Sequence, residues 1–174
     1  ACPGLEGDLA RLVEGAGGSS PHLLSLLQRE GGWLPGALDA PDAALEAETA
    51  RLRETPPDAL GDALRQAKRR VALLVALADL GGAWQLEEVT GALTQLADLA
   101  VSLALRAGLS AELRRGRLPG QEQADLETGC GAVALAMGKM GAGELNYSSD
   151  IDLICLFDET RYDADAVQDA RAGL

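Results

Sequence analysis

The sequence predicts an α+β protein in which a mostly helical leading segment is followed by the first strands of a mixed sheet. Two observations carry this prediction. Apolar residues recur every three or four positions over long stretches before residue 130, which is the period of an amphipathic helix. After that point, two short apolar runs enclose a glycine-rich connector, which is typical of paired strands. We therefore predict a helical segment, 1–130, and the start of a second domain, 131–174.

Capping and breaking residues place the helices. Ser20-Pro21 is a typical helix start, and Gly31-Gly32 follows as a stop. Trp84, at the entry to the last long helix, is predicted to be a core residue. The predicted helices cover about residues 5–15, 21–30, a segment capped by Asp39 or Asp42 that runs to about 53, 58–80 and 86–106, with loops at 33–39 and 121–129 and a polar helix at 161–174.

The helix predicted over 58–80 concentrates positive charge at Arg65, Lys68, Arg69 and Arg70. A solvated helix face with acidic neighbours is the simpler interpretation. The alternative is a contact with a nucleotide or with an acidic partner surface.

Composition excludes some classes of function. The 174 residues carry a net charge of −12, which argues against a broad basic surface for nucleic acid. A protein substrate or a small nucleotide fits better. The chain has three cysteines without a CxxC pair and a single histidine, His22, so no zinc set is expected. Cys2, Cys130 and Cys155 are expected to be reduced, which indicates a cytoplasmic protein, and Cys155 is expected in the core.

We expect neither a signal peptide nor a membrane span. The chain has no charged-then-apolar leader. The run Val71–Leu80 is about ten residues long and contains Asp79, so it is far shorter than a membrane-spanning helix. Because the first residue is Ala and residue 174 falls inside a helical pattern, we expect a fragment of a longer chain.

The chemical signal lies between the two predicted strands. The first strand, Ala132–Met137, ends at Gly138-Lys139, and the second carries Asp150 and Asp152. Alternate residues of a strand share a face, so the two carboxylates are expected side by side. Adjacent carboxylates repel each other unless a cation lies between them. Hard oxygen ligands favour Mg²⁺ or Mn²⁺, so Asp150 and Asp152 are candidate metal ligands and catalytic residues.

Phosphate-binding groups surround this pair in the sequence. Gly138 allows a close approach of the backbone to a phosphate, and Lys139, Ser148 and Ser149 add donors. The Gly138-Lys139 pair is not a P-loop, because Met140 stands where that motif requires Ser or Thr.

These residues resemble a known superfamily. A strand, then Gly-Lys, then a connector and Asp-x-Asp resembles the polymerase-β-like nucleotidyltransferases. The longer run GKMGAGELNYSSDIDLI resembles the bifunctional glutamine synthetase adenylyltransferase/adenylyl-removing family, and Glu144–Asp152 is more similar to its N-terminal, adenylyl-removing half. The resemblance extends over roughly residues 57–158. It implies that 131–174 begins a nucleotidyltransferase core, in which Gly138, Lys139 and Ser149 bind phosphate oxygens and Ser148 is a weaker candidate.

The resemblance also implies an activity. The adenylyl-removing half releases AMP from a tyrosine of glutamine synthetase by phosphorolysis to ADP, and the other half adds AMP from ATP, so nucleotide, phosphate and glutamine synthetase are expected ligands. A PII signalling protein is an expected regulator. No nucleic acid or membrane partner is expected. The superfamily takes a third carboxylate from a later strand, and none is predicted here. We therefore expect an incomplete site that is inactive in this chain alone.

Three alternatives stay open at this point. The chain could belong to the adenylyl-adding half, or it could be a regulatory or docking module with an unfinished site. It could also belong to another nucleotidyltransferase, such as an antibiotic-modifying enzyme, although that type places its motif near the N-terminus.

Overall fold

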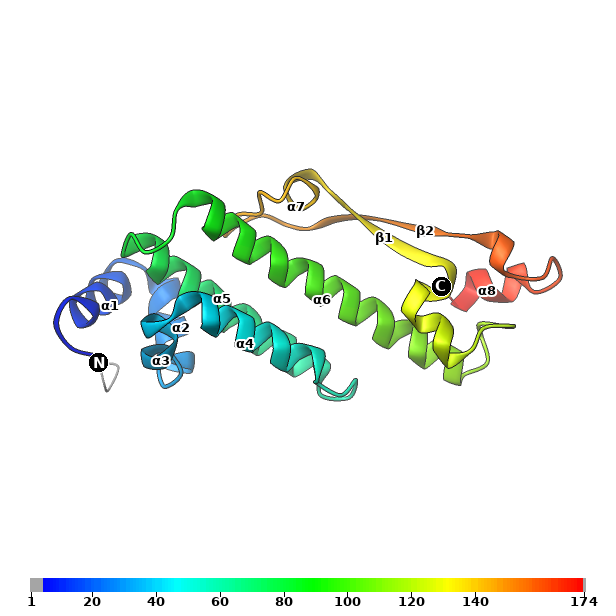
Figure 1. The fold of residues 1–174 in the computed structure, drawn as a ribbon, viewed down its shortest axis with the longest axis horizontal. Coiled ribbons are helices and arrows are strands. Elements are labelled where there is room, and N and C mark those ends of the chain that lie inside the picture. The colour runs from blue at the N-terminus through cyan, green and yellow to red at the C-terminus, as the bar shows by residue number, and fades with distance from the viewer. Residues whose placement is uncertain (1–4, 174) are drawn as a thin grey trace. The chain divides into compact units, whose positions relative to one another are not determined.

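The computed structural model describes residues 5–173, which form a mostly helical α+β chain with one small sheet (Figure 1). The predicted fold class is confirmed. Cys2 lies outside the described residues. In chain order the elements are α1 (Gly7–Ser19), α2 (Pro21–Glu30), α3 (Leu34–Asp39), α4 (Pro41–Arg53), α5 (Leu60–Leu80), α6 (Leu86–Arg114), the 3-10 helix η1 (Gln123–Gly131), β1 (Ala132–Met137), α7 (Gly138–Gly141), β2 (Asp152–Phe157), the 3-10 helix η2 (Glu159–Arg161) and α8 (Val167–Gly173).

Local capping explains why α2 forms where the sequence predicts it. The Ser20 side chain accepts a hydrogen bond from the Leu23 amide at 3.3 Å, and Pro21 occupies the first turn. Two segments predicted as loops are helical instead. Residues 34–39 form α3, because its buried Leu34 and Ala37 are stabilised by packing that local sequence does not reveal. Residues 123–131 form the 3-10 helix η1.

The structure divides into two compact units. One unit contains the residues up to 96 together with 143–149, and the other contains 97–142 and 150–174. All described helices longer than nine residues precede β1. The predicted separation of helices from strands along the sequence is therefore correct, and the domain boundary stays a prediction.

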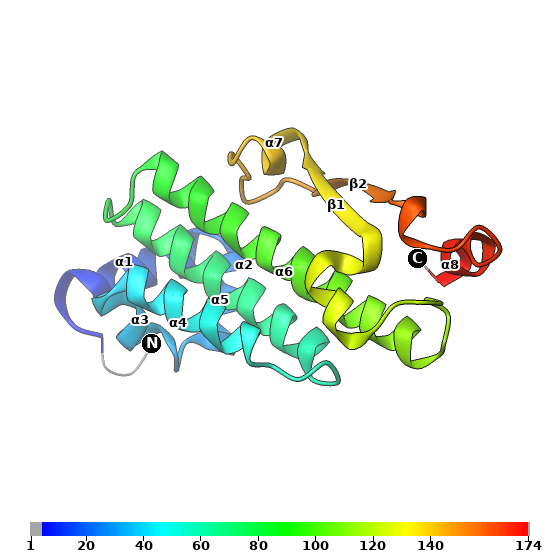
Figure 2. The same cartoon turned by 45° about the vertical axis from the view of Figure 1, so that its right-hand side comes forward.

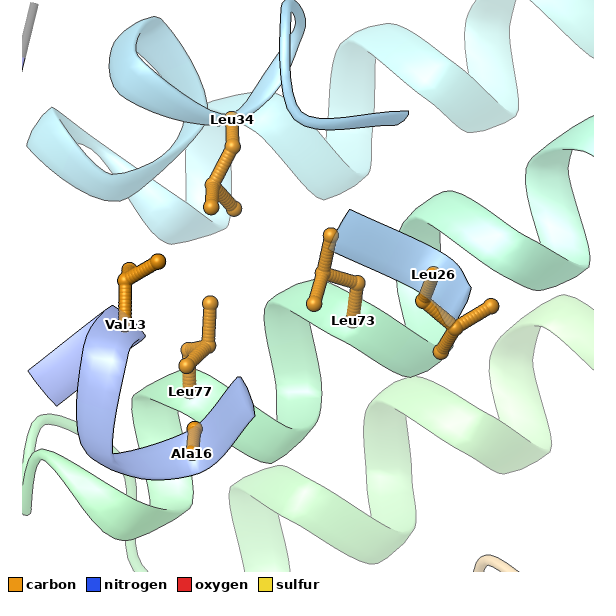
Figure 3. Close-up of a cluster of buried hydrophobic side chains, with 6 residues drawn as sticks. All are labelled: Val13, Ala16, Leu26, Leu34, Leu73 and Leu77. Atoms are coloured by element: carbon orange, nitrogen blue, oxygen red, sulfur yellow. The ribbon is translucent and has the colours of Figure 1, made fainter. Parts of the chain in front are cut away.

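The first unit is built around the long helix α5. Leu73 and Leu77 of α5 are almost fully buried, and Figure 3 shows them among side chains from α1, α2 and α3. The buried members of this cluster are Val13, Ala16, Leu26, Leu34, Leu73 and Leu77. Trp84 is buried as predicted. Aliphatic packing thus replaces aromatic packing in a chain with only 3% aromatic residues.

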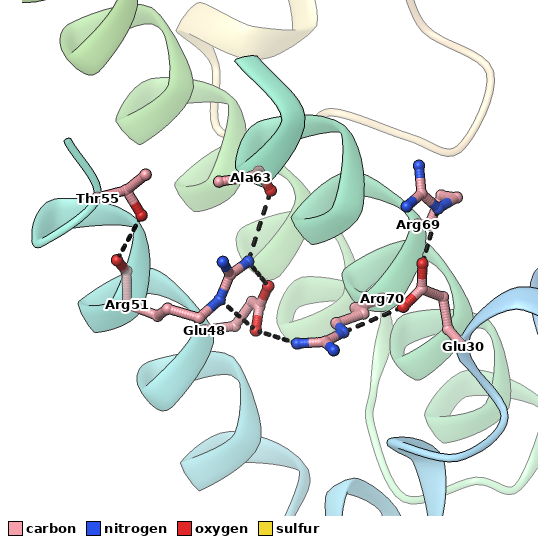
Figure 4. A network of polar contacts seen from close by, with 7 residues as sticks. All are labelled: Glu30, Glu48, Arg51, Thr55, Ala63, Arg69 and Arg70. Carbon is pink, nitrogen blue, oxygen red and sulfur yellow. Dashed lines mark hydrogen bonds and ion pairs between the residues drawn. The ribbon is translucent and has the colours of Figure 1, made fainter. Parts of the chain in front are cut away.

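A network of ion pairs lies beside this core (Figure 4). The side chains of Glu30 and Glu48 are each only 4% exposed. Arg70 joins them: its Nε donates to Glu30 at 3.1 Å and its Nη1 donates to Glu48 at 3.2 Å. Arg69 also donates to Glu30, at 2.7 Å, and Arg51 pairs with Glu48. Each buried carboxylate therefore has two cationic partners, which offsets the cost of removing its charge from water.

This network shows which residues of the basic run on α5 face solvent and which are paired inside the protein. Arg65 is exposed and pairs with Asp62 at 2.7 Å, as expected for a solvated helix face. Arg70 instead lies partly buried, with its guanidinium carbon 5.3 Å from the centre of the Trp33 ring. That distance suits a cation–π contact. Two of the four basic residues, Arg69 and Arg70, are therefore engaged in ion pairs inside the protein.

The second unit contains an antiparallel hairpin of β1 and β2 (Figure 2). Its small core consists of Leu109, Leu118, Leu126 and Cys130. The Tyr162 hydroxyl donates to the Cys130 carbonyl at 2.6 Å, and the Tyr162 and Phe157 rings pack with centroids 5.1 Å apart. Burial raises the pKa of the Cys130 thiol. These contacts hold the end of the hairpin opposite to the candidate site.

The hairpin exposes apolar side chains. One face carries the exposed residues Val133, Leu135, Met137, Ile154 and Leu156. Cys155, predicted to lie in the core, is exposed on β2. The prediction assumed that both faces of the sheet are covered, and these residues remain open to solvent because the described sheet has only two strands.

Among the described residues, α6 is the one helix long and apolar enough, by length and composition, to cross a membrane. The sequence argument considered Val71–Leu80 and overlooked this helix. Core helices of globular proteins share this composition, so the property alone does not assign α6 to a membrane.

The buried network predicts a large stability difference between two arginines of the same helix. Arg70→Ala leaves two buried carboxylates with one partner each, and we expect the free energy of unfolding to fall by about 3 kcal/mol. Arg65→Ala removes an exposed pair and is expected to cost at most about 0.5 kcal/mol. Urea denaturation followed by circular dichroism measures both. Equal losses in the two variants would contradict the role given to Arg70.

Candidate functional site

The register of the hairpin brings a carboxylate to the glycine turn. Met137, the last residue of β1, pairs with Asp152, the first residue of β2. Gly138 follows Met137 directly and has a φ of +55°, where a side chain would be strained. A Cβ on Gly138 would lie 3.3 Å from Asp152 Oδ2. The structure therefore places the Asp152 carboxylate against the Gly138 backbone.

Asp150 does not lie on the strand. β2 begins at Asp152, whereas Asp150 is exposed and belongs to the irregular segment before it. The prediction that strand alternation places both carboxylates on one face is therefore wrong, because Asp150 is not part of the strand. The strand period applies only once ladder hydrogen bonds hold the backbone, so the direction of the Asp150 side chain is set by the connector.

The turn α7 depends on a second glycine. A Cβ on Gly141 would clash with the carbonyl oxygen of Ala136 and lie 3.0 Å from its carbonyl carbon. Met140 is buried and anchors the same turn, and the Ala142 amide donates to the Gly138 carbonyl at 3.1 Å. The close approach of α7 to β1 thus requires glycine at 141.

Lys139 projects from this turn as an exposed side chain. Within residues 5–173 no salt bridge involves it. Its ammonium group is therefore available to an anion approaching the turn.

Ser148 and Ser149 lie in a loop that belongs to the other compact unit. The Asn146 side chain organises this loop, because its Oδ1 accepts from the Ser148 amide at 3.2 Å and from the Ser149 hydroxyl at 2.6 Å. The Ser149 amide also donates to the Asn146 carbonyl, at 3.3 Å. Both donors of Ser149 are thus engaged inside the loop. The Ser148 hydroxyl makes no hydrogen bond to another described residue.

The carboxylates available for a metal ion are few. Across residues 5–173 no three His, Cys, Asp or Glu side chains gather as a metal centre would require. Asp150 and Asp152 are two hard oxygen ligands, which fits part of the shell of Mg²⁺ or Mn²⁺. After β2 the described chain has only η2 and α8, so the third carboxylate of the resemblance stays a prediction for a part of the protein outside this chain.

The sequence analysis did not identify two residues that accept hydrogen bonds from the loop that contains Ser148 and Ser149. Thr94 of α6 accepts a hydrogen bond from the Leu145 amide at 3.2 Å, and Asp79 of α5 accepts one from the Tyr147 hydroxyl at 3.1 Å. Both partners are about fifty or more positions away in the sequence. The one available signal was an acidic residue in the last turn of a helix, where the helix dipole disfavours it.

Comparison with known proteins covers nearly the whole chain. The family model of glutamate-ammonia ligase adenylyltransferase matches residues 9–173. No solved structure matches the chain.

Several curated proteins are similar, and each carries the name bifunctional glutamine synthetase adenylyltransferase/adenylyl-removing enzyme. The protein of Bradyrhizobium sp. (strain BTAi1) is 60% identical over 95 residues, which are 55% of this chain and 10% of the relative. That of Rhodopseudomonas palustris (strain TIE-1) is 43% identical over 157 residues, 87% of this chain and 16% of the relative. That of Xanthobacter autotrophicus is 46% identical over 147 residues, 82% of this chain and 15% of the relative.

The chain therefore spans a small part of the length of these relatives. The family match extends from the helical segment through the Gly-Lys turn and Asp152 to α8. This chain belongs to the glutamate-ammonia ligase adenylyltransferase family.

Proposed function

We propose that the full-length protein containing this chain removes AMP from an adenylylated tyrosine of glutamine synthetase by phosphorolysis. The observation that carries the proposal is the Asp152 carboxylate held against the Gly138 turn at the end of an antiparallel hairpin. Family membership supports adenylyl transfer as the reaction class. The resemblance of Glu144–Asp152 to the adenylyl-removing half supports the direction.

The reaction is a displacement at the α-phosphorus. A phosphate oxygen forms a bond to this phosphorus while the bond to the tyrosine oxygen breaks, which yields ADP and a tyrosine oxygen that takes up a proton. The protein contributes mainly positioning and charge neutralisation. We assign Asp150 and Asp152 to a divalent cation, Mg²⁺ or Mn²⁺, which when bound would neutralise phosphate charge.

The remaining residues bind phosphate oxygens in this proposal. The Gly138 backbone permits a close approach, and the exposed Lys139 supplies a positive charge. Ser148 offers a hydroxyl without a partner among the described residues, whereas Ser149 donates to Asn146. We therefore give the direct contact to Ser148 and assign Ser149 to shaping the loop, which reverses the order of the two serines expected from the motif.

The adenylyl-adding reaction is the second candidate. It uses the same carboxylates and the same displacement in the opposite sense, so the geometry supports both. A regulatory module is the third, favoured by the presence of only two carboxylates at the site within residues 5–173.

Removal of either carboxylate is expected to abolish turnover. The full-length protein is incubated with adenylylated glutamine synthetase, phosphate and Mg²⁺ or Mn²⁺, and ADP is followed. Asp152→Ala and Asp150→Ala should each lower the rate at least about 10²-fold, as for loss of a charge-stabilising group. Asp165→Ala, an exposed carboxylate of the same unit, serves as the control and should keep the activity.

Each outcome of this assay selects one candidate. ADP that forms only with phosphate supports the proposal. AMP transferred from ATP to unmodified synthetase, without ADP formation from the adenylylated form, selects the adding reaction. A folded protein with neither activity selects the regulatory module.

Gly138→Ala tests the turn separately from the carboxylates. The added Cβ meets Asp152 Oδ2 at 3.3 Å in a backbone with positive φ, so both the turn and the carboxylate must shift. We expect a loss of activity of about tenfold or more from misplacement of the reacting groups. Gly108→Ala, which meets nothing within 4 Å in the middle of α6, is the matched control. Unchanged turnover in Gly138→Ala would contradict a role for this turn in phosphate binding.

A further inference from the structure

The connection between β1 and β2 is too long to fix the register of the hairpin. β1 ends at Met137 and β2 begins at Asp152, so residues 138–151 join the two strands. Loops of about two to five residues set the register of a hairpin through their turn geometry, and this connection is much longer. Another part of the structure therefore holds the strands at the register that places Asp152 beside Gly138.

The side chains of β1 tolerate a slip of two residues. The strand reads Ala-Val-Ala-Leu-Ala-Met, so one face carries three alanines and the other carries three larger apolar residues. A slip of two residues exchanges alanine for alanine on the first face and one large apolar side chain for another on the second. The same slip would move Asp152 by about 7 Å along the strand relative to Gly138. The pattern of β1 thus gives little protection against a displacement that would take the site apart.

The open end of the hairpin, where β1 begins and β2 ends, is closely fitted. The Asp158 amide donates to the Gly131 carbonyl at 2.9 Å, which continues the ladder beyond the pair of Ala132 and Phe157. A Cβ on Gly131, which has a φ of +87°, would lie 3.3 Å from the Asp158 carbonyl oxygen and 3.2 Å from Arg161 Cδ. A slip that moved a residue with a side chain to this place would meet both contacts.

Tyr162 holds both strands at this open end. Its ring packs on that of Phe157, the last residue of β2, with centroids 5.1 Å apart. Its hydroxyl donates at 2.6 Å to the carbonyl oxygen of Cys130, which lies just before β1. Tyr162 is only 7% exposed, and burial raises the pKa of its hydroxyl, so the group keeps its proton and stays a donor at neutral pH. One side chain thus fixes the start of β1 against the end of β2.

The carbonyl that Tyr162 binds belongs to a constrained segment of backbone. Gly129, Cys130 and Gly131 have φ of +66°, +49° and +87°, and Cys130 is the one residue other than glycine with a positive φ among the described residues. Left-handed backbone at a residue with a side chain costs free energy and persists where the surroundings enforce it. The Cys130 side chain is fully buried in the small core beside Leu109 and Leu126. This core and the Tyr162 hydroxyl together fix the point from which β1 starts.

We propose that Tyr162 is a positioning residue for the candidate site, which sets the register of the hairpin and thereby the place of the Asp152 carboxylate beside Gly138. This inference rests on the proposed function for the role of Asp152. Tyr162 does not touch the reacting groups, because the length of β2 separates its contact with Phe157 from Asp152 by about 17 Å. Every contact in this argument lies within the second unit.

A cysteine introduced into β1 of the full-length protein reports the register directly. Ala134 pairs with Cys155, and the Cα atoms of directly opposed strand residues lie within the range that a disulfide spans. Ala134→Cys should therefore form a disulfide with Cys155 under mild oxidation, and mass spectrometry of the linked peptides identifies it. Ala132→Cys and Ala136→Cys are the matched controls, because they lie two residues away on the same face and reach Cys155 only after a slip.

The Tyr162 variants are expected to change the register and the turnover together. Tyr162→Phe removes the hydroxyl alone, and Tyr162→Ala also removes the ring contact. Both should lower the yield of the 134–155 disulfide and raise that of the 132–155 or 136–155 disulfide. For ADP formation, kcat should fall about threefold to tenfold in Tyr162→Phe and further in Tyr162→Ala, with KM for glutamine synthetase unchanged. Arg171→Ala, which breaks an exposed ion pair with Glu159 in the same unit, is the control and should keep the register and the activity.

A locked register separates positioning from general stability. Tyr162→Phe is combined with Ala134→Cys, and the disulfide to Cys155 is formed. The kcat of this oxidised protein should return to within about twofold of that of oxidised Ala134→Cys alone, because both then have the same register. Reduction of the disulfide should remove the gain. Circular dichroism at the assay temperature checks that each variant is folded, so that a lower kcat reports displacement and not loss of folded protein.

Two results would overturn the positioning role. One is an unchanged pattern of disulfides in both Tyr162 variants, whatever their kcat, and the other is a low kcat that the 134–155 disulfide does not restore. Failure of the proposed function gives a different pattern. In that case the disulfide yields shift in the Tyr162 variants as expected, but the wild-type protein forms no ADP from adenylylated synthetase.

Discussion

The pairing of Met137 with Asp152 across the hairpin is the contact from which the candidate site takes its geometry. One residue beyond this pair, β1 turns at Gly138, where glycine accepts both the positive φ and the adjacent carboxylate without strain. A slip of the strands by one residue would carry Asp152 to the opposite face. The turn and the carboxylate therefore depend on the same ladder of backbone hydrogen bonds.

In the helical unit, oppositely charged side chains pair with each other inside the protein. In an acidic chain the arginines are expected at the surface, yet Arg69 and Arg70 turn inward to Glu30 and Glu48. These pairs join α2, α4 and α5. Buried ion pairs contribute little net stability compared with apolar packing, but they tolerate only one arrangement of partners. They thereby define how the helices that hold Asp79 pack together.

The hairpin of the second unit has a face of apolar side chains that is exposed to solvent in the described structure. Large apolar side chains such as Leu135 and Ile154 lie open to solvent on a sheet of two strands, and a pair of strands is marginal by itself. The relatives are several times longer than this chain. A sheet face of this size is stable in water once further strands or helices cover it.

The sequence by itself determined the features that depend on neighbouring residues. Helical periodicity predicted α2, α4 and α5 closely, and the apolar run predicted β1 at its observed bounds, because propensity, capping and period act over a few positions. The motif likewise identified Gly138 and Asp152 as candidate site residues, and the structure shows that they lie next to each other. Only the tertiary structure decided that residues 34–39 are helical, that Arg70 is internal and that Asp150 lies before the strand. It alone attached the loop to Thr94 and Asp79, since contacts between residues fifty or more positions apart leave no local signal in one sequence.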